Sequence, residues 1–279
     1  MTALLRKILH FKGKFRLVRF LFRKKLRTSR NITVTGRHGL KYYLPNLKEN
    51  IAFEIFTDGI YEKDTSDLII KKLPPNSVLL DIGANIGSIT MPVCVARSDV
   101  KVICIEASRK VFSYLEKNIS VNKLNNCILV NKAIADSDNR EVGFFNPDDL
   151  FGKGSMSLSH TSPTEKVQTI TIDSLLAELK IPELDFIKID IEGFEYFAFK
   201  GAEKTLLQTN APDILFEFLD SAETADRNLK PGDAQILLVN YGYTLYKIGP
   251  YNKLTHLPQP MTTGESMIYA TKKNENSYK

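Results

Sequence analysis

A short apolar run that ends in a glycine-bearing turn constrains the fold of this chain more than any other segment. Residues 78–82 (VLLDI) have the pattern of a buried strand, and residues 83–87 (GANIG) follow as a turn that leads into a helix. Such a turn forms a nucleotide pocket at the carboxyl edge of a parallel sheet. A second apolar run, residues 100–105, ends in Glu106 and predicts the next strand. Asp81 and Glu106 are 25 residues apart, which leaves room for one strand, one helix and a turn.

The charges at these two strand ends discriminate between nucleotide ligands. A pyrophosphate fingerprint has glycine where this chain has Asp81, and a carboxylate there would repel phosphate. S-adenosylmethionine has no phosphate, and its sulfonium and ammonium groups suit a carboxylate. Glu106, at the tip of the second strand, is placed to accept both ribose hydroxyls of an adenosine ligand. The pattern therefore favours an S-adenosylmethionine site over a dinucleotide site, and over a chance glycine turn in another α/β protein.

Strand and helix patterns alternate along the rest of the chain, which is typical of a mostly parallel sheet with helices on both faces. Further core strands are predicted at residues 127–131, 186–191, 214–218, 243–248 and 266–270, with Ser108 capping the helix before the first of these. The last two strands match the antiparallel terminal hairpin of a class I methyltransferase sheet. We therefore predict an α/β, class I methyltransferase Rossmann-like fold with a seven-stranded sheet in the order 3-2-1-4-5-7-6.

Two extra strands, residues 141–145 and 167–172, flank a segment rich in Gly, Ser, Asp and Pro. We expect this segment, residues 146–165, to be a mobile loop over the active site. Ahead of the core, residues 31–35 and 41–44 predict a hairpin, and residues 65–72 a helix.

Charge is distributed unevenly along the chain. Of the 38 Lys and Arg residues 14 precede Glu49, whereas none of the 32 Asp and Glu residues does. The net charge of +6 therefore divides into +14 for residues 1–48 and −8 for the rest, so the overall charge is no general argument for nucleic-acid binding. We predict four parts: a basic amphipathic helical segment (1–30), a prelude of hairpin and helix (31–75), the methyltransferase domain (76–272) and a polar tail (273–279).

Residues 1–30 have the periodicity of one helix with a single apolar stripe. The stripe recurs at steps of three and four, at Leu4, Ile8, Phe11, Phe15, Val18, Phe22 and Leu26. Its apolar runs are too short and too charged to span a bilayer, and no cleavage site of a secretory signal follows them. Three interpretations stay open: a helix on an anionic membrane surface, a helix packed on the domain or a partner, and an organelle transit peptide. We expect a cytoplasmic protein with free cysteines, peripheral on a membrane under the first interpretation.

A segment at the end of the fourth core strand is the most specific in the chain. Residues 185–195 (DFIKIDIEGFE) resemble the fourth motif of FkbM-type methyltransferases, a Lys-Ile-Asp-x-Glu-Gly-x-Glu strand tip. Other segments that fit this family are residues 81–87, 133–136, 171–175 and 216–218. The resemblance covers about residues 50–220, more loosely to 270, and leaves out the basic N-terminal segment. It implies an S-adenosylmethionine-dependent enzyme that O-methylates sugars, polysaccharides or natural products.

The resemblance also implies roles for individual residues. The cofactor loop would consist of Asp81, Gly83, Ala84, Asn85 and Gly87. Glu106 would hold the ribose with Ala107 beside it, while Ala133 and Ile134 would lie against the adenine. Tyr61 and Glu62 match a Tyr-Glu pair upstream of the glycine turn and would cover the methionine end.

Methyl transfer is an in-line displacement, so the protein must align the acceptor and remove its proton. Asp190 stands at the end of the fourth strand and is expected to orient the methionine ammonium or the acceptor. On an extended strand Glu192 shares its face, and repulsion between the two carboxylates would raise one pKa towards that of a useful base. Lys188 has the same parity as Asp190 and is expected to pair with it.

Glu217 completes the predicted catalytic group of Asp190, Glu192, Glu217 and Lys188. It interrupts an apolar run, where a charge needs either a function or an ion-pair partner. Two alternatives stay open: Glu192 and Glu195 would cap the following helix, and His160 in the loop would act as the base. We expect no metal.

These observations predict an O-methyltransferase acting on a hydroxyl of a saccharide, glycan or related small molecule. An alternative is an RNA 2′-O-methyltransferase whose basic segment grips phosphates. Only Lys188 and Asp190 match its Lys-Asp-Lys-Glu tetrad, so nucleic acid is not the expected partner. A second alternative is a membrane-associated adaptor with a non-catalytic Rossmann-like domain, which the intact loop glycines and cofactor carboxylates disfavour.

Overall fold

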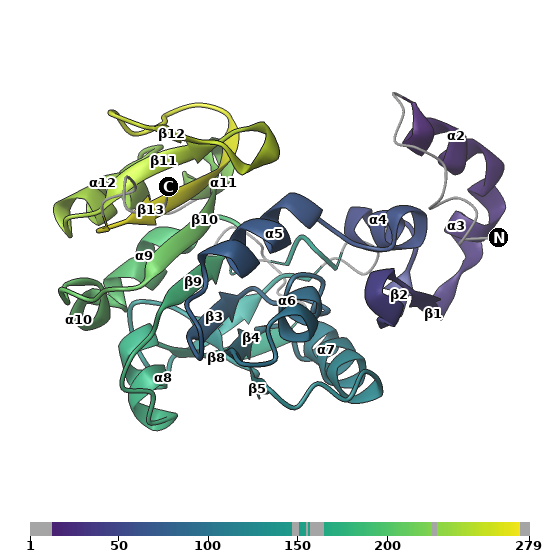
Figure 1. Ribbon diagram of the computed structural model, residues 1–279, viewed down its shortest axis with the longest axis horizontal. Coiled ribbons are helices and arrows are strands. Elements are labelled where there is room, and N and C mark those ends of the chain that lie inside the picture. Colours follow the sequence, from purple (N-terminus) through teal and green to yellow (C-terminus); the bar gives the residue numbers. More distant parts are fainter. Residues whose placement is uncertain (1–12, 147–150, 155, 157–164, 225–227, 274–279) are drawn as a thin grey trace.

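The computed structural model describes residues 13–146, 151–154, 156, 165–224 and 228–273 (Figure 1). Its largest element is an eight-stranded sheet within these ranges. The strands are β3 (Val78–Ile82), β4 (Lys101–Ile105), β5 (Cys127–Val130), β9 (Phe186–Ile189), β10 (Asp213–Leu219), β11 (Thr244–Ile248), β12 (Leu254–His256) and β13 (Glu265–Thr271). Their order in space is β12-β11-β13-β10-β9-β3-β4-β5.

The strand order confirms the predicted class I fold. Strands β3, β4, β5, β9 and β10 pair in parallel, and β13 runs antiparallel to both β10 and β11. Counted along the chain from β3, the order from β5 to β11 is 3-2-1-4-5-7-6, as predicted. The sheet has one strand more than predicted, because β12 pairs with β11 at the edge. A strand of three residues is too short to show an alternating pattern in the sequence.

Helices cover both faces of the sheet. On one face α5 (Lys63–Lys72), α6 (Thr90–Ala96) and α7 (Arg109–Val121) share a core with Leu79 and Phe186. On the other face α8 (Ile172–Glu178), α9 (Glu195–Lys200), α10 (Glu203–Leu206) and α12 (Asp233–Asn240) pack on Leu80 and Ile187. Successive residues of a strand point to opposite faces, and both faces are buried under helices. The strand sequences are therefore continuous apolar runs. The short helices α11 (Asp220–Glu223) and η2 (Pro250–Asn252) lie in connections.

A second, small sheet follows β5. It consists of β6 (Ala133–Ile134), β7 (Glu141–Phe144) and β8 (Glu165–Ile170) in the order β6-β8-β7. The antiparallel pairing of β7 with β8 confirms the two extra strands. The loop predicted between them lies largely outside the described residues, as does His160.

The prelude packs against the main sheet. Strands β1 (Arg30–Thr35) and β2 (Lys41–Asn46) form the predicted antiparallel hairpin around η1 (Arg37–Gly39). The sequence did not predict α4 (Asn50–Asp58), which begins where the Glu49 carboxylate accepts the N–H of Ile51 and ends at left-handed Gly59. Buried residues of the hairpin and α4 belong to the same core as α5, α6 and α7. The proposed domain boundaries stay a prediction.

The basic N-terminal segment is not one helix in its described part. Helices α2 (Lys14–Leu21) and α3 (Arg23–Thr28) are separated at Phe22, whose φ of −107° and ψ of 15° interrupt the helix. Gly13 has a φ of 106°, so α2 begins after it instead of running through it. Residues 1–12 lie outside the described residues. Over the described ranges, none of the helices has the length and apolar character needed to cross a membrane.

The three cysteines meet between α6, β4 and β5. All are free thiols, and Cys94 and Cys104 are buried, as expected from the sequence. The Sγ atoms of Cys94 and Cys127 are 2.9 Å apart.

Candidate active site

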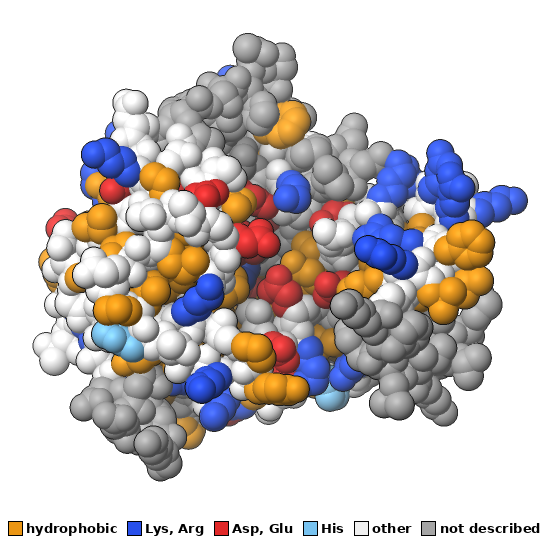
Figure 2. Space-filling view, turned by 90° about the horizontal axis from the view of Figure 1, so that it is seen from above, with side chains coloured by type: hydrophobic (Ala, Val, Ile, Leu, Met, Phe, Trp, Pro, Cys, Tyr) orange, Lys and Arg blue, Asp and Glu red, His pale blue; other side chains and the backbone are white. Residues whose placement is uncertain are grey.

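A cavity lies at the carboxyl ends of the parallel strands, where the sequence predicts the site. Figure 2 shows Asp and Glu side chains around a hollow near the centre of the molecule. Among the predicted residues in its wall are Tyr61, Glu62, Gly83, Ala84, Asn85, Glu106, Ala107, Ala133, Ile134, Lys188, Asp190, Glu192 and Glu217. The structure therefore brings together every predicted site residue except Asp81 and Gly87. None of these roles is tested by geometry alone, and they stay predictions.

The glycine turn forms the floor of the cavity and lies directly on two strand ends. The backbone N–H groups of Gly83 and Ala84 both donate to the carbonyl of Ile105, at 3.0 and 2.9 Å. Gly83 has a φ of 74°, and a Cβ atom there would lie 2.0 Å from the carbonyl oxygen of Asp190. No side chain fits, so glycine is required at this position. Gly87, also with positive φ, packs on Leu115 and shapes the loop from behind.

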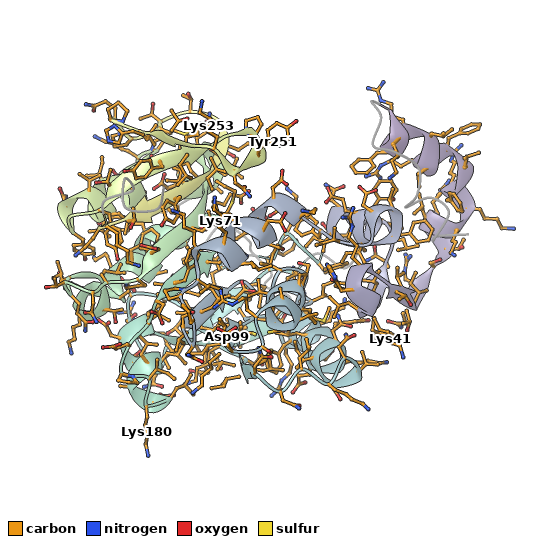
Figure 3. All side chains as sticks on the ribbon, viewed as in Figure 1. Lys41, Lys71, Asp99, Lys180, Tyr251 and Lys253 are labelled. Carbon is orange, nitrogen blue, oxygen red and sulfur yellow. The ribbon has the colours of Figure 1, made fainter. Side chains whose placement is uncertain are left out.

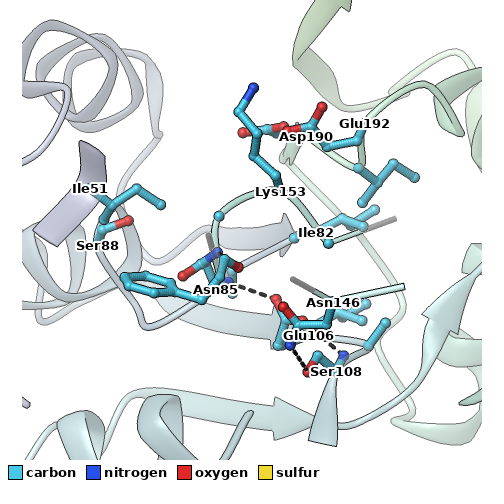
Figure 4. Close-up of a pocket in the computed structure, with 18 of the residues that line it drawn as sticks. Ile51, Ile82, Asn85, Ser88, Glu106, Ser108, Asn146, Lys153, Asp190 and Glu192 are labelled. Atoms are coloured by element: carbon cyan, nitrogen blue, oxygen red, sulfur yellow. Dashed lines mark hydrogen bonds between the residues drawn. The ribbon is translucent and has the colours of Figure 1, made fainter. Parts of the chain in front are cut away.

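Glu106 is held by backbone groups of the floor. Its two carboxylate oxygens accept N–H groups from Asn85 at 3.0 Å and Ser108 at 2.9 Å (Figure 4). Burial raises the pKa of Glu106 to about 7, although these two hydrogen bonds oppose the rise. Ser108 caps α7 through Val111, as predicted. Further hydrogen bonds from ligand hydroxyl groups would stabilise the charged carboxylate and lower this pKa.

An apolar wall adjoins Glu106. Ala133 and Ile134 of β6 are buried and line the cavity, with Ala107 nearby. Phe144 and Met156 pack in the same cluster as Ala133. This wall is suited to the flat, weakly polar face of an adenine ring.

Asp81 lies beneath the floor and is not among the residues that line the cavity, and its cofactor role stays a prediction. The side chain is fully buried and accepts a hydrogen bond of 2.5 Å from the Thr90 hydroxyl. Its other oxygen is 3.6 Å from the ammonium of Lys188. On β3, Asp81 shares a face with Leu79, which packs under α5 and α6. Lys188, its register partner on β9, shares this face and does line the cavity, so Asp81 is joined to the cavity wall through Lys188.

Lys188 connects Asp81 to the rim of the cavity. Its ammonium is 3.7 Å from the Asp190 carboxylate, the predicted pairing, and 3.4 Å from the carbonyl of Gly83. Burial lowers the pKa of Lys188, but the charges of Asp81 and Asp190 outweigh burial and raise it to about 12. Lys188 is therefore a fixed cation and not a proton acceptor.

Four carboxylates form the rim: Glu62, Asp190, Glu192 and Glu217. The expectation that Glu192 continues an extended strand is wrong, because β9 ends at Ile189 and Glu192 has a left-handed φ of 53°. The turn with Gly193 nevertheless keeps Glu192 in the cavity wall. Glu195, not Glu192, satisfies the backbone before α9, accepting the N–H of Ile191 at 3.0 Å.

Burial and neighbouring charges raise the pKa values of two rim carboxylates, Glu192 and Glu217. Burial, followed by the charges of Asp190 and Glu192, raises the pKa of Glu217 to about 8. Burial and the charge of Asp190 also raise the pKa of Glu192, while Lys153 lowers it. Burial likewise raises the pKa of Tyr61. Glu217 thus has a pKa close to neutral pH, as a general base requires.

Within the predicted loop the structure describes residues 146, 151–154, 156 and 165, and all of these except Glu165 line the cavity. The carbonyl of Phe151 accepts a hydrogen bond of 3.1 Å from the Asn85 side chain. Lys153 lies beside Glu192 (Figure 4). Gly152 packs closely on Glu49, at the start of α4.

Sequence reasoning missed several residues of the wall: Glu49, Ser88, Lys132, Phe144, Asn146, Phe151, Lys153 and Met156. Apart from Phe144, the last residue of β7, they come from connections, and tertiary packing brings them to the cavity. Their only signal was position, since Asn146, Phe151, Lys153 and Met156 fall in the predicted loop. Among the described residues, no group of three or more His, Cys, Asp or Glu side chains is arranged to hold a metal ion.

The sheet order and the cavity at its carboxyl edge define the class of S-adenosylmethionine-dependent class I methyltransferases. A family profile described as methyltransferase FkbM domain matches residues 81–245. The chain therefore belongs to the FkbM methyltransferase family, as its sequence motifs indicated.

Individual relatives are distant. A hexuronic acid methyltransferase, AglP of Haloferax volcanii, is 24% identical over 149 residues, which span 53% of this chain and 59% of AglP. A precorrin-6y C5,15-methyltransferase structure from Geobacter metallireducens is 14% identical, with a TM-score of 0.44 over 77% of this chain and 93% of that one. A TehB-like methyltransferase structure from Corynebacterium glutamicum is 14% identical, with a TM-score of 0.43 over 78% and 91%.

Proposed function

We propose that this enzyme O-methylates a hydroxyl group of a saccharide, glycan or related small molecule. The observation that carries the proposal is the rim of carboxylates, in which the pKa of Glu217 reaches about 8. A hydroxyl must lose its proton during methylation, and a base with a pKa near neutral is suited to take it. The name of the distant relative, a hexuronic acid methyltransferase, supports a saccharide acceptor.

In this proposal the residues of the floor hold the cofactor. Glu106 accepts the ribose hydroxyls, Ala133 and Ile134 contact the adenine, and Tyr61 and Glu62 cover the methionine end. Bound S-adenosylmethionine supplies a methyl group on a sulfonium, which is a good leaving group. The raised pKa of Glu106 fits this role, because hydroxyl donors stabilise its charged form.

The rim residues remove the proton of the acceptor hydroxyl and align the reacting groups. We assign proton removal to Glu217, because Asp190 is paired with the fixed cation Lys188. Asp190 and Glu192 align the acceptor hydroxyl or the methionine ammonium. Removal of the proton leaves the acceptor oxygen as the attacking group in line with the departing sulfur.

The rim disfavours the RNA alternative. Glu62, Asp190, Glu192 and Glu217 surround the mouth of the cavity and would repel the phosphates on either side of a ribose. The basic residues that would grip phosphates belong to α2 and α3, which lie at the end of the molecule (Figure 1). We also propose a cytoplasmic enzyme, peripheral on an anionic membrane through residues 1–30.

The first experiment is calorimetric titration of the full chain with S-adenosylmethionine, followed by an acceptor screen. We expect micromolar binding and methyl transfer to hydroxyls of neutral sugars, amino sugars or uronic acids, with the product located by NMR. Transfer to RNA ribose with no transfer to any saccharide would overturn the acceptor class. Absence of cofactor binding by the folded chain would overturn the proposal as a whole.

A further inference from the structure

The described basic segment has two apolar faces, of which the sequence shows only one. Leu17, Phe20 and Leu21 on α2 are not part of the predicted stripe, yet their exposed fractions are 47%, 78% and 60%. They stand three and four positions apart, so they share one side of the helix. A cluster of large apolar side chains on a surface needs an explanation, whereas scattered ones do not.

The predicted stripe itself is occupied within the chain. The rings of Phe15 and Phe53 pack edge to face with centroids 5.5 Å apart, and those of Phe22 and Phe56 at 5.6 Å. Val18 and Leu26 are buried in the same core. Figure 3 shows side chains filling the space between α4 and the two basic helices.

Two polar contacts also tie the segment to α4. The Lys14 ammonium is 2.6 Å from the Asp58 carboxylate, and Arg19 lies over the ring of Phe53 at 4.1 Å. The face that the sequence suggested for a membrane is therefore directed inward.

Basic side chains surround the exposed apolar cluster. A shallow surface hollow is lined by Phe20, Leu21, Arg23, Lys24, Arg27 and Thr28. The three basic residues are exposed, and no ion pair joins them to a carboxylate in the described part of the chain. Figure 2 shows Lys and Arg side chains gathered around hydrophobic ones on this lobe, in the same view as the acidic hollow.

We infer that this face binds an anionic lipid surface through a wedge of Leu17, Phe20 and Leu21 ringed by Arg23, Lys24 and Arg27. Each basic residue near an anionic membrane contributes attraction, while the apolar side chains gain by leaving water at the headgroup boundary. The two leucines favour lipid over RNA, because aliphatic side chains neither pair with phosphate nor stack on bases. The opposite charges of the two regions orient the molecule, since the acidic body is repelled by the same surface.

The test is sedimentation of the full chain with vesicles of phosphatidylcholine alone or with added phosphatidylglycerol. We expect binding only to the anionic vesicles, weakening as salt rises. The variant Leu17→Ser/Phe20→Ser/Leu21→Ser should partition about tenfold more weakly. Arg23→Gln/Lys24→Gln/Arg27→Gln should lose on the order of 100-fold at low salt, since each charge is worth about fivefold.

A matched control is Leu207→Ser/Ile236→Ser/Val239→Ser, three apolar residues of similar exposure elsewhere on the surface, which should bind vesicles as wild type does. S-adenosylmethionine binding should be unchanged in all three variants, which checks folding and separates this inference, which rests on the proposed membrane association, from the proposed methyl transfer. Wild-type failure to bind anionic vesicles would overturn the inference. The inference would also be overturned if the Leu17→Ser/Phe20→Ser/Leu21→Ser variant bound anionic vesicles as wild type does, while a variant lacking residues 2–12 did not bind them. RNA binding by the wild type is measured alongside. If Arg23→Gln/Lys24→Gln/Arg27→Gln lost RNA binding but kept vesicle binding, this face would be a nucleic-acid surface and the inference would be overturned.

Discussion

The floor and the rim of the cavity are built on different principles. In the floor, backbone groups define the geometry: Gly83 touches the Asp190 carbonyl, and two N–H groups fix the Glu106 carboxylate. In the rim, side chains of like charge gather, and burial together with neighbouring charges raises the pKa values of Glu192 and Glu217. A backbone-defined site is rigid and suits one invariant ligand, here the proposed cofactor. A rim of side chains can be altered one residue at a time, which suits an acceptor that differs between enzymes.

The strongest test of this contrast is Glu217→Gln in the rim. If Glu217 removes the proton, kcat should fall by roughly 10²–10⁴ while cofactor affinity stays the same. In the wild type, kcat/KM should rise with pH and level off above about 8, because the base must be unprotonated. Glu178→Gln, at an exposed residue of α8, is the control. An unchanged kcat would assign the base to Asp190 or Glu192.

In the floor, Gly83→Ala should weaken cofactor binding by on the order of 100-fold and lower the melting temperature. The left-handed φ alone costs about 1–2 kcal/mol, and the clash with Asp190 adds to it. Gly39→Ala isolates the first contribution, because Gly39 has a φ of 75° and a Cβ atom at that position would meet nothing within 4 Å. If the two substitutions lowered the melting temperature equally, the close approach of Gly83 to the Asp190 carbonyl would not contribute to stability.

Glu106→Gln should weaken cofactor binding about tenfold, by removing a charged hydrogen-bond acceptor. It should also change how stability depends on pH. With a pKa of about 7 against a usual 4.5, folded wild type retains a proton that the unfolded chain has lost. Stability should therefore fall as pH rises from about 4.5 to 7, by up to about 3 kcal/mol.

Melting temperatures measured between pH 5 and 8 report this slope. In the Glu106→Gln variant the slope should be shallower, whatever the absolute stability. An identical slope in both proteins would mean that Glu106 is already ionised in the free enzyme.

The smallest effect is expected from Lys153→Ala. Lys153 is exposed and lowers the pKa of Glu192, so its loss should raise the KM of the acceptor by about threefold and leave kcat unchanged. Lys166→Ala, at an exposed lysine paired with Glu141, is the control and should change neither the KM of the acceptor nor kcat. A weaker affinity for S-adenosylmethionine instead would place Lys153 with the floor.

The floor was predictable from the sequence because its signals are local. A strand run, a glycine turn and Glu106 at the next strand tip lie in one short stretch, and Ser108 is recognisable as a helix cap. The strand order was predictable for another reason, because the series of strand and helix patterns matches that of a class I methyltransferase sheet. The cofactor role of Asp81 stays a prediction: its side chain lies behind the cavity wall and is joined to it through Lys188.

The part of the cavity wall that the sequence missed depends on contacts between distant segments. Asn85 bonds to Phe151 across 66 residues, and no local pattern reports such a contact. Glu49 reaches the cavity because α4 forms there, and α4 derives its stability from packing on the hairpin and the basic helices. Glu192 stayed in the cavity for a reason other than the expected one, because the Glu192–Gly193 turn replaced an extended strand.

Helix α4 carries a practical consequence for anyone who expresses this protein. It starts beside Glu49 in the cavity wall and ends at Asp58, where Lys14 holds it, while Phe53 and Phe56 lie under the aromatic rings of the basic segment. Trimming residues 1–30 as a dispensable leader would strip the cover from these two rings. The shortened protein would then be prone to aggregate, and a loss of activity would be mistaken for a loss of localisation.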